Sequence, residues 1–110
     1  MEIVRTSSYS NALKRLRKLG ASLDDITSME DAIANAPGAG VVIRGTNGLR
    51  KIRFAFGHRG KSGGGRTIYY VMANDELIYL LAAYAKADKS DLTTQEKALF
   101  SALIEDLTHD

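Results

Sequence analysis

Cysteine is absent from this chain of 110 residues, and histidine occurs only at His58 and His109. Without cysteine there is no disulfide and no thiolate nucleophile. The two histidines lie far apart in the sequence, so we expect no zinc site, and we predict no other metal and no small-molecule cofactor. No apolar run reaches membrane-spanning length and the N-terminus lacks a signal-peptide core, so we expect a cytoplasmic protein without membrane contact.

Acidic residues are missing from the middle of the chain. No Asp or Glu occurs between Asp31 and Asp75, and the window 32–74 contains seven Lys or Arg residues. Because the net charge of the whole chain is +2, the flanks of this window together carry −5. Positive charge concentrated in one segment most often meets phosphate, which makes this window the first candidate for a nucleic-acid contact.

The composition is that of one ordinary globular domain. Hydrophobic residues make up 45% of the chain and charged residues 25%, as in typical soluble proteins. A chain of this length forms one modest core. We therefore predict a single domain over residues 1–110.

The N-terminal part of the chain predicts a short strand followed by two helices. Residues 2–5 have the pattern of a strand, and Ser8 or Ser10 is placed to cap the first helix. Ser22 and Asp25 have the spacing of a capping box, which indicates the start of the second helix. The expected apolar stripe of that helix consists of Leu23, Ile26, Met29 and Ile33.

The pattern changes to strands after residue 40. Residues 41–44 have the composition of a strand, and Asn47-Gly48 predicts a type I′ hairpin turn. The return strand is expected over residues 49–56. A glycine-rich loop over 57–65 and a strand of high β-propensity over 66–72 follow.

Side-chain alternation in the return strand separates apolar from basic residues. Ile52, Phe54 and Phe56 share one face of a strand with a period of two, while Lys51 and Arg53 share the other. We therefore expect the core to take the apolar side chains and the two cations to lie together on the opposite face.

The C-terminal part has one ambiguous segment and one clear helix. The Leu and Ala content of 77–86 favours a helix, whereas a turn at 74–76 would make it the next antiparallel strand, and its composition leaves both open. As a strand it places four residues on one face: Leu80, Ala82, Tyr84 and Lys86. Thr93 and Glu96 form a capping box for the last helix. The expected apolar stripe of that helix is Leu99, Phe100, Leu103, Ile104 and Leu107.

Three ordered blocks carry a family resemblance: GLRKIRFA, GKSGGGRTIYYV and LLAAYAKADKSDLT. They resemble the RelE/HigB group of bacterial type II toxins, in its HigB-like branch, over roughly residues 41–97. The resemblance implies an α+β fold with a twisted antiparallel sheet, two N-terminal helices and a C-terminal helix, the helices packing on one face. It makes 77–86 a strand.

The resemblance also implies a function. Toxins of this group are metal-independent mRNA endoribonucleases that enter the A site of the 70S ribosome, cut the translated message and so inhibit translation. A cognate antitoxin protein masks them. The implied partners are therefore an antitoxin, the ribosome and mRNA.

Cleavage of RNA through its own 2′-hydroxyl requires that this hydroxyl lose its proton, that the phosphorane charge be stabilised and that the 5′-oxygen be protonated. In the resembling toxins, basic residues on the strands orient the message and stabilise the phosphorane. The resemblance gives this role to Lys51, Arg53 and Arg66. The two arginines suit it, because an arginine stays charged and binds phosphate bidentately. Three further residues are expected to contact RNA: Arg50, Arg59 and Lys61.

The chain departs from the pattern of these toxins at two positions. Several of them have a tyrosine at the start of the last helix, where this chain has Thr93, and some have an arginine at the end of the last strand, where it has Ala87. We expect Tyr84 and Lys86 to take over these catalytic roles, with the tyrosine ring stacking on a base.

Two other functions stay open for this fold. One is a ParE-like inhibitor of DNA gyrase, which has no need of a phosphorane-stabilising group of cations. The other is a nucleic-acid-binding module that has lost cleavage, an alternative supported by Thr93 in place of the tyrosine.

Overall fold

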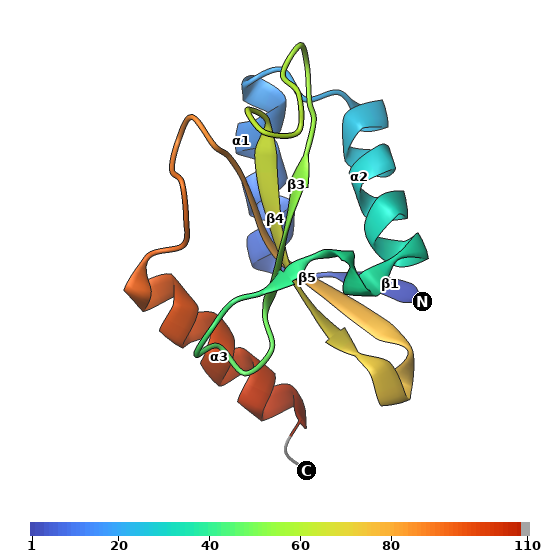
Figure 1. The fold of residues 1–110 in the computed structure, drawn as a ribbon, viewed down its shortest axis with the longest axis vertical. Coiled ribbons are helices and arrows are strands. Elements are labelled where there is room, and N and C mark those ends of the chain that lie inside the picture. Colours follow the sequence, from blue (N-terminus) through green and yellow to red (C-terminus); the bar gives the residue numbers. More distant parts are fainter. Residues whose placement is uncertain (109–110) are drawn as a thin grey trace.

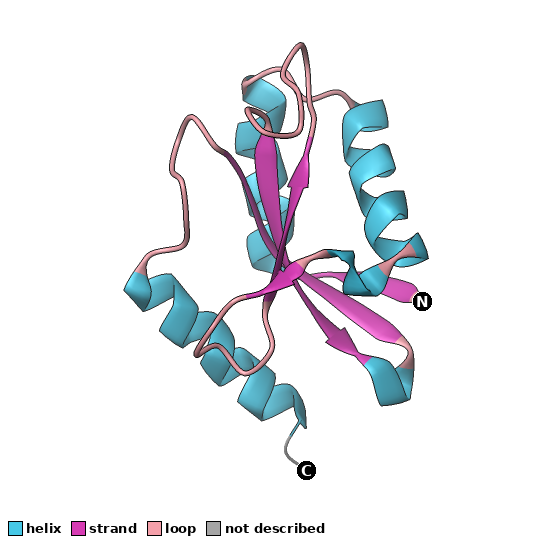
Figure 2. Ribbon diagram, viewed as in Figure 1, coloured by secondary structure: helices cyan, strands magenta, loops and turns pink. Residues whose placement is uncertain are grey.

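The computed structural model describes residues 1–108, and His109 therefore lies outside the described residues. Within this range the chain forms three α-helices, five strands and two 3₁₀ turns (Figures 1 and 2). Their bounds are β1 Glu2–Arg5, α1 Ser7–Lys18, α2 Leu23–Asn35, η1 Pro37–Ala39, β2 Val41–Val42, β3 Arg50–Phe54, β4 Gly65–Met72, η2 Ala73–Asp75, β5 Leu77–Ala85 and α3 Thr94–Thr108. The predicted α+β class is confirmed.

The strands form one mixed sheet in the order β1-β5-β4-β3-β2. Neighbouring strands from β5 to β2 are antiparallel, but β1 pairs with β5 in parallel. The expected sheet was antiparallel throughout, and this is wrong for the pair of β1 and β5. Two helices and three strands separate these strands in the chain, so no hairpin turn sets their relative direction. The strand predicted over 77–86 is confirmed as β5.

The helices are divided between the two faces of the sheet. α1 and α2 pack on the face that buries Phe54, Tyr69 and Leu80. α3 packs on the other face, against Ile68 and Leu81; Figure 1 shows it well apart from α1 and α2. The expectation that all helices share one face is therefore wrong. Both faces of β4 and β5 carry apolar side chains, so helices must shield both faces from water.

A register shift in β5 changes which residues share a face. Ile68 pairs with Ala82 and Tyr69 with Leu80, so Leu81 is an extra residue on β5. This bulge turns Leu80 toward α1 and α2, whereas Tyr84 faces α3. The prediction that Leu80 shares a face with Tyr84 is therefore wrong, because a bulge interrupts the period of two.

The helix starts agree with the predicted caps at two of three positions. The capping boxes of Ser22 with Asp25 and of Thr93 with Glu96 are both present. The cap of α1 is Thr6 rather than a serine, and the Ser8 hydroxyl instead donates to the carbonyl oxygen of Leu81 at 2.6 Å. The serine thus ties α1 to β5.

The connection between β2 and β3 is longer than a two-residue hairpin. Asn47 and Gly48 have φ values of 60° and 103°, as a type I′ turn requires. The strands themselves first pair at Val42 and Arg50. β2 is therefore only two residues long, and beyond Lys51 the outer edge of β3 has no pairing strand within the described residues.

Two residues of the predicted apolar stripes are exposed. Leu23 is 62% and Leu99 67% exposed, so their predicted burial is wrong. Leu23 is the first residue of α2, beyond the end of the core. Leu99 precedes the buried Phe100, and one residue rotates a side chain by about 100° around the helix axis.

Candidate nucleic-acid interface

Strand pairing brings three predicted site residues into one row across the sheet. Arg53 of β3 pairs with Arg66 of β4, and Arg66 pairs with Tyr84 of β5. Lys51 lies two residues from Arg53 and therefore on the same face. Directly paired residues have Cβ atoms about 5 Å apart, so the two arginine side chains start from neighbouring points.

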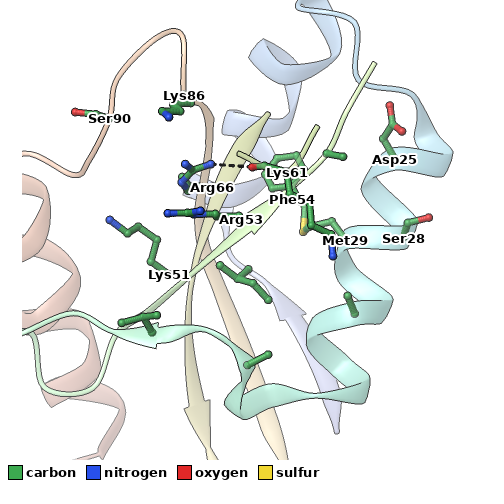
Figure 3. A pocket seen from close by; sticks show the side chains of 15 residues that line it. Asp25, Ser28, Met29, Lys51, Arg53, Phe54, Lys61, Arg66, Lys86 and Ser90 are labelled. Carbon is green, nitrogen blue, oxygen red and sulfur yellow. Dashed lines mark hydrogen bonds between the residues drawn. The ribbon is translucent and has the colours of Figure 1, made fainter. Parts of the chain in front are cut away.

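Lys86 follows β5 directly and joins this group. Figure 3 shows Lys51, Arg53, Arg66 and Lys86 pointing to the same side of β3 and β4. We call these four residues the cationic face. Within residues 1–108 no carboxylate lies within 4 Å of Arg53, Arg66 or Lys86, the range of the ion pairs found elsewhere in the chain. Like charges held together favour binding of an anion, and three of these four residues have no counter-charge within that range among the described residues.

The cationic face forms one wall of a groove with a volume of about 890 Å³. The groove passes over the outer edge of β3, where β2 has ended, and its other wall comes from α2 (Figure 3). Met29, Ile52 and Phe54 give that side an apolar lining. An extended polymer with charged and apolar parts, such as single-stranded RNA, matches these two linings.

Arg66 is the most buried member of the cationic face, with 6% of its surface exposed. Its guanidinium donates to the carbonyl oxygens of Gly65 at 2.9 Å and of Lys61 and Ser62 at 3.3 Å each. A guanidinium has five N–H donors, so two remain for a ligand. Arg66 therefore also holds the glycine-rich loop against the sheet.

The glycine-rich loop approaches the sheet closely at two of its glycines. A Cβ at Gly64 would collide with the carbonyl oxygen of Phe54, and one at Gly65 would lie 2.5 Å from the Phe54 ring. A Cβ at Gly63 would meet nothing within 4 Å. At two of the three consecutive glycines, close packing against Phe54 thus leaves no room for a larger side chain.

Asp91 is a site residue that the sequence did not reveal. Its carboxylate lies 3.5 Å from the Lys51 ammonium and 3.8 Å from that of Lys97 on α3. Partial burial raises the pKa of Asp91, but the Leu92 amide and the two ammonium groups outweigh it and hold this pKa below its ordinary value. The segment that is free of acids in the sequence therefore has a carboxylate beside it in space.

Tyr84 is packed rather than presented to a ligand. It is 6% exposed, and the Lys89 ammonium lies 5.0 Å from its ring centroid. Lys89 is itself held by two hydrogen bonds to Glu96, at 2.7 and 2.8 Å. Burial, reinforced by the charge of Asp91, raises the pKa of Tyr84 to about 12 despite the opposing effect of Arg66. Stacking of this ring on a base would require Lys89 to move.

The three residues predicted to contact RNA lie at different places. Arg50 is on the opposite face of the sheet, where it donates to the carbonyl oxygens of Gly38 and Gly40. The Arg59 guanidinium stacks on the Phe56 ring at 4.7 Å. Lys61 lines the groove. The structure thus brings only Lys61 of the three to the groove.

Within residues 1–108, no three His, Cys, Asp or Glu side chains gather as a metal site would need. The chemistry available at the groove is that of ammonium and guanidinium groups, which bind phosphate oxygens and stabilise charge on them. None of the described helices has the length and apolar composition of a membrane span.

Comparison with known proteins identifies the family. The family model described as "RelE toxin of RelE / RelB toxin-antitoxin system" matches residues 9–109. A free-state mutant of the E. coli toxin RelE has a similar fold, with a TM-score of 0.58 and 19% identity over 89% of this chain and 94% of that one.

Two further E. coli structures are similar at comparable levels. RelE in the intact RelBE toxin–antitoxin complex gives a TM-score of 0.54 and 20% identity, over 76% of this chain and 94% of that one. The isolated RelE toxin gives 0.54 and 17%, over 96% and 97%. The HigB-like branch stays a prediction. Since the family model covers nearly the whole sequence, the chain belongs to the RelE family of type II toxins.

Proposed function

We propose that this toxin is a ribosome-dependent endoribonuclease that cuts translated mRNA in the ribosomal A site without a metal ion. One observation carries the proposal: Arg53 and Arg66 are direct cross-strand neighbours with no carboxylate within 4 Å among the described residues. Two adjacent guanidinium groups are suited to the extra negative charge of a phosphorane.

The four residues of the cationic face divide the chemistry by their exposure. Arg53 is exposed and free to bind the scissile phosphate. The buried Arg66 offers the same phosphate the two N–H donors that do not bind the glycine-rich loop. Lys51 and Lys86 flank the arginines. The 2′-hydroxyl oxygen attacks phosphorus and its proton passes to water, the bond from phosphorus to the 5′-oxygen breaks, and one of the two ammonium groups donates a proton to the leaving 5′-oxygen. We assign Tyr84 no contact with the reacting atoms, because it is buried beneath Lys89.

The proposed partners are mRNA on the ribosome and a cognate antitoxin. E. coli RelE has been crystallised with its antitoxin in the RelBE complex. For this chain we propose that an antitoxin inhibits by covering the cationic face, since acidic residues placed there would exclude RNA phosphate.

The test uses the purified toxin and ribosomes programmed with a defined codon in the A site. We expect cleavage of the message at that codon, unchanged by a metal chelator. Lys51→Ala should slow it by about 10²-fold, because it removes one of the two ammonium groups that can protonate the leaving 5′-oxygen. Arg44→Ala, which removes a charge from the exposed turn between β2 and β3, should leave it unchanged.

Two results would contradict the proposal. Inhibition of gyrase with intact messages would indicate the ParE-like activity. Tight binding to programmed ribosomes without any cleavage would indicate a module that has lost catalysis.

A further inference from the structure

The loop between β5 and α3 places a carboxylate of the protein itself at the edge of the cationic face. Asp91 lies between Lys51 of β3 and Lys97 of α3 and is the only carboxylate within 4 Å of any cationic-face residue in the described chain. Its side chain is 45% exposed. Its partner Lys51 and the preceding residue Ser90 both line the groove, so the carboxylate lies next to the groove.

The two ion pairs of Asp91 are loose. Their distances are 3.5 and 3.8 Å, whereas the other three ion pairs of the described residues measure 2.6 to 3.0 Å. One carboxylate oxygen already accepts a hydrogen bond from the Leu92 amide at 2.8 Å. Exposed and poorly aligned pairs of this kind are among the weakest in proteins and are easily exchanged.

We propose that the Asp91 carboxylate occupies the position of an RNA phosphate between Lys51 and Lys97 and competes with RNA for these two ammonium groups. This inference rests on the proposed RNA binding at the cationic face. An entering phosphate displaces the carboxylate and takes its two counter-charges. Asp91 thereby lowers the affinity of the free toxin for RNA and favours substrates that supply enough further contacts to displace it.

The test measures binding of a short single-stranded RNA with 2′-O-methyl riboses, which cannot be cut through a 2′-hydroxyl. Fluorescence anisotropy gives its affinity for the full chain over a series of salt concentrations. Asp91→Asn should tighten binding about fivefold at low salt, since a unit charge is removed a few ångströms from the phosphate. The slope of log K against log salt should change by less than about 0.7, the value for one phosphate contact on a single strand, because the same phosphate contacts both ammonium groups once it has displaced the carboxylate.

Matched variants separate this effect from net charge and from folding. Asp75→Asn removes the same charge from the turn η2, outside the groove, and should change affinity less than twofold. Asp91→Glu keeps the carboxylate and should keep the wild-type affinity. In a Lys51→Ala/Lys97→Ala background, Asp91→Asn should give no gain.

Two results would overturn the inference, and they are distinguishable from failure of the proposed function. If wild-type toxin binds RNA and Arg53→Ala weakens that binding, but Asp91→Asn behaves like Asp75→Asn or binds less tightly, the competition by Asp91 is wrong. If no variant binds RNA and the message on programmed ribosomes is not cleaved, both proposals are wrong.

Discussion

Each of the three consecutive glycines next to Arg66 has its own surroundings. Gly64 faces the backbone carbonyl oxygens of Phe54 and Gly60, which cannot rotate away as a side chain can. Gly63 faces open space. The three residues are identical in the sequence, and only the path of the loop over β3 gives them different surroundings.

We therefore expect Gly64→Ala to lower the free energy of unfolding by about 1–3 kcal/mol, because the added methyl group forces backbone shifts. Gly63→Ala should change it by less than about 0.5 kcal/mol. Urea denaturation of the two variants measures the difference. Equal effects would show that the loop is not held against the sheet as described.

The Tyr84 hydroxyl is buried and has no hydrogen-bond partner among the described residues. Its removal in Tyr84→Phe should leave the free energy of unfolding unchanged or raise it by up to about 1 kcal/mol, since an unsatisfied polar group is no longer buried. Message cleavage should also be unchanged. A loss of cleavage with unchanged stability would show that the Tyr84 hydroxyl takes part in the reaction.

Three elements meet at a polar cluster that the sequence did not indicate, in which Glu30 and Tyr9 are buried. Glu30 of α2 accepts two hydrogen bonds from Arg5 of β1, at 2.6 and 2.9 Å, and one from the Tyr9 hydroxyl of α1 at 2.8 Å. Burial and the hydrogen bond to Glu30 raise the pKa of Tyr9, so the phenol stays protonated. The cluster fixes α1 and α2 relative to the first strand.

Tyr9→Phe should lower the free energy of unfolding by about 1.5–3 kcal/mol, the range for a hydrogen bond to a charged group. Tyr79→Phe is the matched control, because Tyr79 is only half-buried. Thermal and urea unfolding of both variants provide the comparison. A cost for Tyr9→Phe no larger than for Tyr79→Phe would contradict the role of the cluster.

Asp25 links the start of α2 to the start of the glycine-rich loop. Its carboxylate accepts hydrogen bonds from the backbone amides of Gly57 and Ser22, each at 3.0 Å, and the Gly57 bond is the larger cause of its lowered pKa. Because the folded-state pKa is lowered, this stabilisation is fully present above the unfolded value of about 3.9 and is lost as the pH falls below it.

Asp25→Asn should therefore lower the melting temperature near neutral pH and make the acid-induced decrease of stability shallower. Asp24→Asn, one residue earlier in the same helical turn, is the control without these bonds. Melting curves between about pH 6 and pH 3 test this. If the melting temperatures of the wild type and Asp25→Asn differ at low pH and converge only above about pH 6, the pH dependence has the opposite sign from the one expected.

The elements and the cationic strand face were predictable because they depend on local patterns. Alternation along β3 placed Lys51 and Arg53 opposite Ile52, and capping boxes located α2 and α3. Asp91 was not predictable, because the loop that carries it returns to β3 only in three dimensions. The bulge at Leu81 was hidden by the uniform Leu and Ala composition of β5.

At the scale of the whole molecule, positive and negative charges lie in different segments, which the small net charge of +2 does not reveal. The acid-free window forms one side of the groove, while the loop before α3 supplies Asp88 and Asp91 to basic residues of other elements. RNA binding through this groove should be strongly salt-dependent, since several phosphates are neutralised at once.

The most direct measurement of the central claim is a map of message 5′ ends in bacteria that express the toxin, compared with Arg53→Ala and Arg44→Ala. Arg53 is the better test residue, because it is exposed whereas Arg66 also supports the loop. We predict new cuts within translated frames, reduced about 10²-fold by Arg53→Ala and retained with Arg44→Ala. Growth arrest with intact messages, or cuts that Arg53→Ala leaves unchanged, would contradict the assignment of the cationic face as the cleavage site.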